Sequence, residues 1–270
     1  MLRQSAVLIT AAFLALPATA RANPRPLPFT YQHEQLAPGS LEVEQAVDLT
    51  PLRALSDSTG AQLWYGHTEF LTEIEYGLAN RLELGLYFSF VPSAAAGFTQ
   101  VARGLNGTGL KQRLRYQLAP TGEWPVDVGV YGELSENERE VELEAKVILQ
   151  RRIGKLRAMV NLTAEQEFYY DGTHDLVIAP SAGLTYEVTP SFQPGFEWWM
   201  RGEYPLENAP SPRPFGLGPA HYVGPVALFQ FGELWWSTGV YLRVNELSHT
   251  MAPGEVFGPV WVRTMIGIGL

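Results

Sequence analysis

The sequence predicts an all-β fold, a transmembrane antiparallel barrel of about twelve strands, on the strength of three observations. The first is strict alternation within segments of about ten residues or more, seen most clearly from Arg81 to Phe90, RLELGLYFSF. Leucine and phenylalanine alternate there with arginine, glutamate, glycine, tyrosine and serine. Successive side chains of a strand point to opposite faces, so this segment has one apolar face and one polar face.

The second observation is the position of the charged residues. Between 107 and 118, Lys111, Arg113 and Arg115 alternate with other residues, and between 140 and 151 glutamates alternate with apolar residues. The apolar face carries almost no charge, as lipid requires, because Lys or Arg at the bilayer midplane costs ~2–4 kcal/mol. The third observation is that short and long connections alternate along the chain. Outer-membrane barrels have short periplasmic turns and longer extracellular loops, so we expect both termini to be periplasmic.

The chain divides into three parts. Residues 1–20 contain one arginine, an apolar run and an Ala-Thr-Ala site, the pattern of a cleaved secretory signal peptide. Residues 21–40 contain four prolines and no periodicity, so we expect an irregular periplasmic arm. Residues 41–270 form the predicted barrel in the outer membrane of a Gram-negative envelope. Its strands are expected at 41–48, 62–78, 81–91, 107–118, 124–134, 140–151, 156–168, 175–188, 192–204, 220–230, 233–245 and 256–270.

A soluble β-sandwich would also show alternation, but globular strands of about 5–6 residues are shorter than these segments. Tryptophans lie mostly towards the predicted strand ends, where we expect aromatic girdles at the membrane interfaces. These tryptophans are Trp64, Trp124, Trp198, Trp199, Trp235, Trp236 and Trp261.

Composition excludes several classes of site. The chain has no cysteine, which rules out disulfides, thiolate metal sites and a cysteine nucleophile. It carries 19 basic and 28 acidic residues, so a basic face for nucleic acid is not expected. No metal site or other cofactor is expected. The expected partners are outer-membrane lipids and lipopolysaccharide, the barrel assembly machinery and a small-molecule permeant, with the oligomeric state left open.

Two segments resemble a known family. Residues 75–90, EYGLANRLELGLYFSF, and residues 104–118, GLNGTGLKQRLRYQL, resemble the outer-membrane family assigned to the meta-pathway of phenol degradation. That family has an acidic strand, a short turn and RLELG, then a glycine-rich turn before a Leu-Lys-Tyr-Arg-Leu strand. This chain has Arg115-Tyr116-Gln117 in place of Lys-Tyr-Arg, and Leu110 where an acid is usual. The resemblance implies an envelope barrel that passes small aromatic or other hydrophobic molecules, without catalytic residues.

Charged residues that share the parity of Glu83 are expected to line the lumen. Acids and bases on neighbouring strands can pair, so the set predicts either a charged constriction that selects permeants or a salt-bridge network that plugs a narrow barrel. The basic run from Lys111 to Arg115 is expected to face the acidic run 140–144, which would polarise the pore, and the acid excess predicts a mild cation preference. The predicted lumen residues are Glu73, Glu75, Glu83, Lys111, Arg113, Arg115, Asp127, Glu133, Glu142, Glu144, Arg157, Glu197, Arg201, Glu233, Arg243 and Arg263.

The predicted function is a channel or transporter for passive passage of small solutes, not an enzyme. One alternative is an outer-membrane lipid-modifying hydrolase, which would need a serine and a histidine near the extracellular rim. Its candidate histidines are His67, His174, His221 and His249, the last beside Ser248. The other alternative is a plugged structural barrel that only displays its loops, among them the proline-rich segment 205–219.

Overall fold

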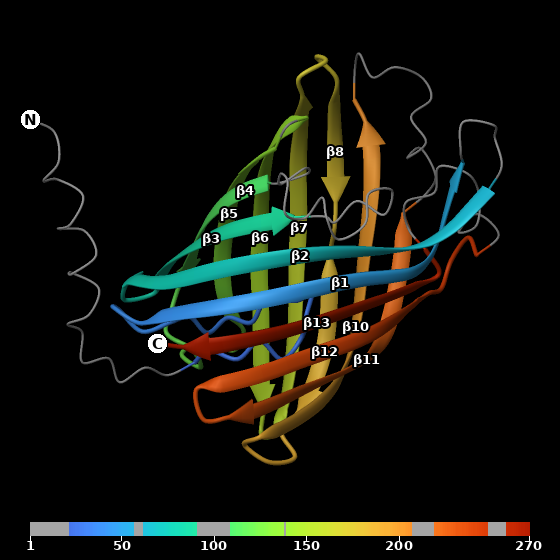
Figure 1. Ribbon diagram of the computed structural model, residues 1–270. Coiled ribbons are helices and arrows are strands. Elements are labelled where there is room, and N and C mark those ends of the chain that lie inside the picture. The colour runs from blue at the N-terminus through green and yellow to red at the C-terminus, as the bar shows by residue number, and fades with distance from the viewer. Residues whose placement is uncertain (1–21, 57–61, 91–108, 138, 207–218, 248–257) are drawn as a thin grey trace, which may run out of the picture.

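The computed structural model describes residues 22–56, 62–90, 109–137, 139–206, 219–247 and 258–270. These residues form antiparallel strands that close into a barrel (Figure 1). The strands are β1 (Leu41–Ser56), β2 (Gln62–Ala79), β3 (Leu82–Phe90), β4 (Gly109–Gln117), β5 (Asp127–Glu136), β6 (Glu140–Ile153), β7 (Leu156–Tyr169), β8 (His174–Ile178), β9 (Ser181–Tyr186), β10 (Phe192–Pro205), β11 (Ala220–Phe231), β12 (Leu234–Arg243) and β13 (Val260–Gly269).

The wall has twelve strand positions, as the sequence predicts. Each strand pairs with its neighbours in chain order, and β1 pairs with β13 to close the barrel. The segments β8 and β9 share one position between β7 and β10, separated by Ala179 and Pro180. Proline lacks the N–H that a ladder needs, which accounts for the interruption of the single strand expected at 175–188.

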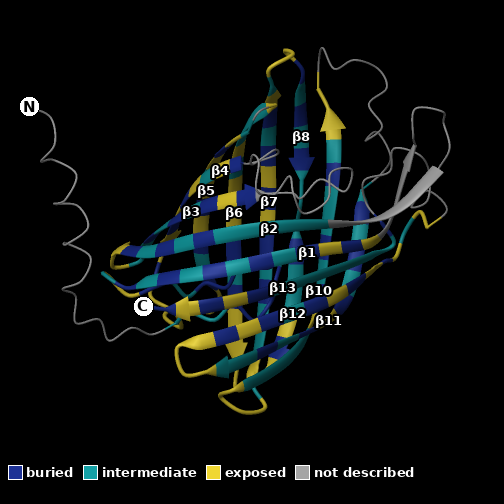
Figure 2. Cartoon of the chain, viewed as in Figure 1, coloured by how far each residue is buried: buried dark blue, intermediate teal, exposed yellow. Residues whose placement is uncertain are grey.

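Alternating burial confirms the two faces of the strands (Figure 2). On β4, Arg113 and Arg115 are buried inside the barrel, while Leu114 between them is 49% exposed on the outside. On β3, Glu83 and Tyr87 are buried and Phe88 is exposed. The charged side chains therefore lie in the lumen and the large apolar ones cover the outer surface, as a lipid-facing wall requires.

The first strand is longer than expected. We expected it to end at Asp48, whereas β1 continues to Ser56 and shifts register against β2 between Thr50 and Arg53. Pro51 lies at this shift, and a proline inside a strand is tolerated at such a bulge. Most of the connection expected at 49–60 is therefore strand.

The barrel has two distinct ends. At the turn end, short turns such as those at Gly154 and Gly232 join the strands; both glycines have positive φ, 60° and 68°. The opposite, loop end carries the β3–β4, β10–β11 and β12–β13 connections. Leu270 N–H donates to Leu41 O at 2.8 Å, so the start of β1 and the end of the chain lie together at the turn end.

The described residues contain no helix long and apolar enough to cross a membrane.

Candidate functional site: an occupied lumen and its cavity

Residues 22–40, called the arm below, lie inside the barrel (dark blue in Figure 1). Backbone N–H groups of the arm donate to Glu42 on β1, Glu83 on β3 and Glu197 on β10. These strands belong to different sides of the closed wall, and only a segment in the lumen can contact all of them. The expected irregular backbone is present, but the expected position outside the barrel is wrong, because lumen side chains bind the arm's polar groups.

The arm enters and leaves at the turn end. Ala22 N–H donates to Glu233 Oε2 in the β11–β12 turn at 2.8 Å, and Gly39 N–H donates to Gly77 O at 2.8 Å. Gly77 is required there, because a Cβ on it would lie 2.1 Å from Ala37 O. The arm is therefore a loop inserted into the lumen from the turn end.

An ion cluster joins the arm to the wall. Arg25 Nη2 donates to Glu44 Oε2 at 2.6 Å and to Glu73 Oε2 at 2.8 Å. Arg113 Nε and Nη2 donate to Glu73 Oε1 at 2.8 and 2.6 Å. All four groups are buried, and buried charges are retained only when they are paired in this way. Gly85 opposite makes room, because a Cβ there would lie 2.5 Å from Arg113 Nε.

Tyr31 of the arm is surrounded by cations. Arg25 Cζ lies 4.2 Å from its ring centroid, Lys146 Nζ 4.6 Å and Arg115 Cζ 5.2 Å. Its hydroxyl also shares a 2.6 Å hydrogen bond with the Tyr87 hydroxyl. A cation over an aromatic face contributes about 0.5–2 kcal/mol, so Tyr31 is a main anchor of the arm.

Phe29 anchors the arm to the opposite part of the wall. Its ring stacks on Trp199 with centroids 4.3 Å apart, and meets Trp261 edge-on at 6.3 Å. Arg263 Cζ lies 3.9 Å from the same ring. The arm thus contacts the wall through an aromatic side chain, Phe29, as well as through its basic side chain, Arg25.

Three tryptophans expected in the membrane girdles instead belong to the lumen. Trp199 and Trp235 are 6% and 0% exposed. Trp235 Nε1 donates to Glu42 Oε1 at 2.6 Å, and Trp261 Nε1 donates to Asp48 Oδ1 at 2.9 Å. The N–H groups of Trp235 and Trp261 thus find carboxylate partners in the lumen, whereas the Trp199 ring stacks there on Phe29 and Tyr222.

The remaining tryptophans lie differently. Trp236 on β12 is 40% exposed on the outer surface, as expected for a girdle. Trp124 is 43% exposed in the β4–β5 connection, where it lines a pocket with Leu36 and Pro38 of the arm. Trp198 is partly exposed and stacks on His221. The side chain of Trp64 lies outside the described set.

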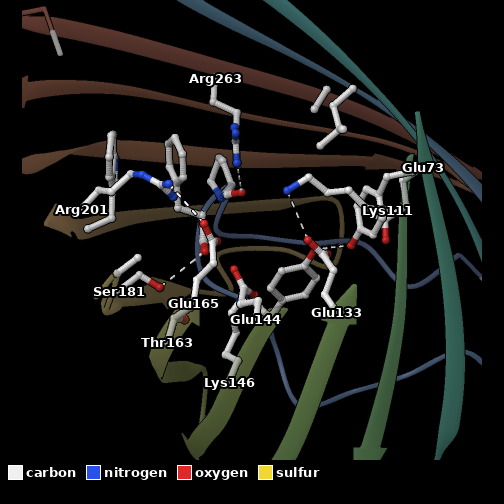
Figure 3. Close-up of a pocket in the computed structure, with 18 of the residues that line it drawn as sticks. Glu73, Lys111, Glu133, Glu144, Lys146, Thr163, Glu165, Ser181, Arg201 and Arg263 are labelled. Carbon is white, nitrogen blue, oxygen red and sulfur yellow. Dashed lines mark hydrogen bonds and ion pairs between the residues drawn. The ribbon is translucent and has the colours of Figure 1, made fainter. Parts of the chain in front are cut away.

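A cavity of about 450 Å³ lies against the arm, with Phe29 and Tyr31 among its lining residues (Figure 3). Lys111, Glu133 and Glu203 also line it, close to the loop end of their strands. This volume falls in the ~300–1,000 Å³ range of small-molecule sites. The arm therefore fills the lumen towards the turn end, and the cavity lies between the arm and the loop end.

Each base that lines the cavity contacts a carboxylate. Lys111 Nζ lies 3.2 Å from Glu133 Oε1, and Arg201 Nη2 lies 3.2 Å from Glu165 Oε1. The basic run 111–115 does meet the acidic run 140–144, at Lys111 and Glu142. The expected division of the lumen into a basic and an acidic side is nonetheless not present, because bases and acids interleave across the ladder. The other pairs are Lys111 with Glu142, Arg201 with Glu167 and Glu203, Lys146 with Glu144, and Arg263 with Asp48.

Carboxylates nonetheless exceed bases around the cavity, with seven glutamates against five lysines and arginines. Glu69 on β2 shows the excess most clearly. It lies opposite Asp48, whose charge is already engaged by Arg263, and within the described ranges it forms no ion pair of its own. The side chains that line the cavity therefore carry a net negative formal charge.

The structure places the sixteen predicted lumen residues in four groups. Those that line the cavity are Glu73, Lys111, Glu133, Glu144, Arg201 and Arg263. Those that contact the arm or the ion cluster away from the cavity are Glu75, Glu83, Arg113, Arg115, Arg157 and Glu197. Those in contacts nearer the barrel ends are Asp127, Glu142 and Arg243. Glu233 is exposed in a short turn, where it binds the start of the arm and does not line a pore.

Several lumen residues are missing from the prediction although their parity places them there. Glu42, Glu44 and Asp48 alternate along β1 on its buried face, and Glu69, Lys146 and Glu165 follow the same rule on their strands. For Arg25 and Tyr31 of the arm, no strand pattern was available.

One group of carboxylates has the spacing of a metal site. Oxygens of Glu42, Glu44 and Glu75 lie within 4.8 Å of one another. Arg25 contacts Glu44 and Glu75, and Trp235 donates to Glu42, so protein groups already occupy these oxygens. A metal ion does not fit this donor set.

The histidines proposed for a hydrolase have other neighbours. His174 packs edge-on against Phe168, with centroids 5.2 Å apart, and His221 stacks on Trp198 at 5.8 Å. Ser248 and His249 lie outside the described residues, as does the side chain of His67.

Comparison of the sequence with protein-family models and with curated proteins finds no match. Solved structures with a similar fold include the COG4313 outer membrane channel from Pseudomonas putida F1, at TM-score 0.53 and 12% identity over 88% of this chain and 98% of that chain. The NanC porin has a TM-score of 0.55 and 9% identity over 84% and 98% of the two chains. The KdgM porin has a TM-score of 0.51 and 8% identity over the same shares, 84% and 98%. At these identities the likeness shows a shared fold, that of outer-membrane channels and porins.

Proposed function

We propose that this protein is an outer-membrane channel for small solutes, and that its own arm occludes the lumen from the turn end. The observation that carries the proposal is the charged cavity of about 450 Å³ inside a closed barrel. A twelve-stranded barrel is wider than the filled eight-stranded ones, so the lumen is wide enough for a segment such as the arm, or a solute in its place.

Passage requires the arm to shift, and its contacts suit such a shift. Contacts to wall side chains hold the arm, whereas continuous backbone ladders hold the strands. Each hydrogen bond contributes a net of about 0.5–1.5 kcal/mol, so the arm can leave while the wall stays closed. Two large anchors, Phe29 and Tyr31, account for much of its binding.

The aromatic permeants that the family resemblance implies remain a prediction. Phe29, Trp199 and Trp261 offer aromatic surface at the cavity, which supports permeants with a ring. The carboxylate excess supports those that also carry positive charge.

Planar-bilayer conductance of the full chain tests the proposal. The release variant, Arg25→Ala/Phe29→Ala/Tyr31→Ala, removes the three side-chain anchors of the arm. Truncating a buried aromatic ring costs about 3–5 kcal/mol and each 1.4 kcal/mol is a factor of ten, so the open-to-closed ratio should rise at least 100-fold. Tyr186→Ala is the matched control, because this tyrosine is 49% exposed on the outer surface.

The outcomes separate two functions. Brief openings in the wild type and sustained conductance in the release variant would support an occluded channel. The occluded lumen also favours a second candidate, a plugged barrel that only displays its loops. For that candidate we expect conductance to be absent from both the wild type and the release variant. Equal, steady conductance in both would show that the arm does not occlude the pore.

A further inference from the structure

The wall binds the backbone of the arm as well as its side chains. Phe29, Tyr31 and His33 are alternate residues, and each has both its peptide N–H and its C=O hydrogen-bonded to wall side chains. For Tyr31, the single side chain of Asn161 makes both bonds: its Oδ1 accepts from the Tyr31 N–H at 2.6 Å, and its Nδ2 donates to the Tyr31 C=O at 3.0 Å. The corresponding partners, at 2.9–3.4 Å, are Glu197 and Ser181 for Phe29, and Gln150 and Gln117 for His33.

This pattern is that of a strand added to a sheet edge. Alternate residues of an extended chain direct their N–H and C=O groups to the same side, and a sheet edge binds them through its own backbone. Here amide, hydroxyl and carboxylate side chains from β4, β6, β7, β9 and β10 take the place of that edge. Binding through main-chain groups does not depend on sequence, so the wall can hold extended polypeptide in general.

Side-chain pockets at the same alternate positions supply selectivity. Leu27 fits against Gly183, where a Cβ would lie 2.5 Å from Leu27 Cδ1. Phe29 enters the aromatic cluster and Tyr31 the cluster of cations. Main-chain bonds with pockets for every second side chain are the two elements of extended-peptide recognition.

We propose that the lumen is a peptide-binding site, that the arm is its tethered occupant, and that short extended peptides with basic and aromatic side chains are the ligand class. Passage of a peptide through the barrel rests on the proposed channel function. Binding of a peptide in the lumen does not. The carboxylate excess, including Glu69 at the cavity, attracts the basic side chains, and the arm itself carries Arg25 and two aromatic anchors.

The arm occupies the peptide site of the wild type because it is covalently attached to the barrel. A covalently attached segment competes at an effective concentration in the millimolar range, so a free peptide binds only when the arm is weakened. Peptide binding to the full-length release variant is therefore the direct test, and wild type is the reference.

The probe is a synthetic, fluorescently labelled peptide with the sequence of residues 24–36, PRPLPFTYQHEQL. A matched peptide carries N-methyl groups at the positions of Phe29, Tyr31 and His33, which removes the three N–H donors and keeps every side chain. Fluorescence anisotropy gives the affinity, and block of conductance gives the position in the pore. We expect saturable binding to the release variant, at least tenfold weaker binding of the N-methyl peptide, and at least tenfold weaker binding to wild type.

The Asn161→Leu substitution in the release variant removes the side chain that holds Tyr31 at both its N–H and its C=O. We expect it to weaken binding of the peptide at least tenfold relative to the release variant with Asn161 intact. A second release variant, Arg25→Ala/Phe29→Ala, repeats the measurement with Tyr31 in place, so that a folding defect of the triple variant does not decide the result.

Equal affinity of the plain and N-methyl peptides, or no binding to either release variant, would overturn the peptide site. If a release variant conducts but does not bind the peptide, the peptide site fails and the channel stands. If it binds the peptide but does not conduct, the channel fails and the peptide site stands.

Discussion

Arg113 is the most heavily engaged charge in the lumen, and its replacement gives the sharpest test of the ion cluster. Its side chain is fully buried, and it donates to Glu73, to Glu75, and to Glu83 at 2.8 Å. Arg113→Met keeps much of the side-chain volume while removing the charge and its donors. The change therefore leaves three buried carboxylates with one cation fewer.

The size of the effect follows from what remains around the carboxylates. Removing one partner of a buried ion pair costs ~3–5 kcal/mol. Arg25 remains 2.8 Å from Glu73, and Arg115 remains 2.8 Å from Glu83, so we expect a loss of ~3 kcal/mol, at the lower end of that range. Glu75 is left worst compensated, because its other cation, Arg25, is 3.7 Å away.

Equilibrium urea unfolding of the protein refolded in lipid vesicles, followed by tryptophan fluorescence, measures this loss. Arg152→Met is the matched control: Arg152 pairs with Glu187 but is 48% exposed, and exposed pairs contribute ~0–1 kcal/mol. Adding Glu75→Gln to Arg113→Met should restore ~1–2 kcal/mol, since it removes the worst-placed charge. A loss in Arg113→Met no greater than in the Arg152 control would refute the reasoning.

Three further predictions concern the wall, the arm and the pore. Leu114→Arg should reduce assembly into vesicles, because the residue is 49% exposed on the outer face and an arginine at mid-bilayer costs ~2–4 kcal/mol; Leu114→Met is the control, and equal yields would contradict the assignment of faces. Burial lowers the pKa of His33 in the seated arm, and the charge of Asp127 offsets part of this effect. The seated arm therefore binds the proton on His33 less readily than the released arm, whose histidine has the ordinary pKa of about 6.5. The stability of the seated arm is complete above about pH 6.5 and is lost as the pH falls from there through the lowered pKa. Channel opening should therefore rise between pH 7.5 and 5.5, and an unchanged pH dependence in His33→Gln would contradict this. The Glu69→Gln substitution in the release variant should lower the potassium-to-chloride permeability ratio measured from reversal potentials, and a ratio that stays the same would show that Glu69 does not face the ion path.

The wall could be predicted from sequence because lipid imposes a simple rule on every strand. Charge cannot face the hydrocarbon, so the parity of one residue such as Glu83 determines the parity of the whole strand. The same parity rule predicts which tryptophans face the lumen. Trp199 shares the parity of Glu197, and Trp261 shares that of Arg263, whereas closeness to a strand end wrongly predicts a membrane girdle for both. Burial in the lumen follows parity, not distance from the strand end.

The arm could not be placed in this way, because its contacts are not made by a ladder. Prolines at 24, 26 and 28 remove the backbone donors from which strand pairing is inferred, and the segment was expected to lie outside the barrel. A weaker signal is present: Leu27, Phe29, Tyr31 and His33 are alternate residues, and in the structure these four residues enter pockets or bind the wall through their backbone. Asn23 and Leu36, which also bind the wall through their N–H groups, do not follow this period throughout the arm.

The arm also changes how charge is distributed in the lumen. When seated, it places Arg25 between Glu44 and Glu73, and it places Glu34 3.8 Å from Arg157. Departure of the arm would remove one positive and one negative charge, so the net charge of the lumen would not change. The local potential would change, because Glu44 and Glu73 would lose the cation between them while Arg157 would lose a carboxylate partner. A permeant with a basic group would then replace Arg25 beside Glu44 and Glu73.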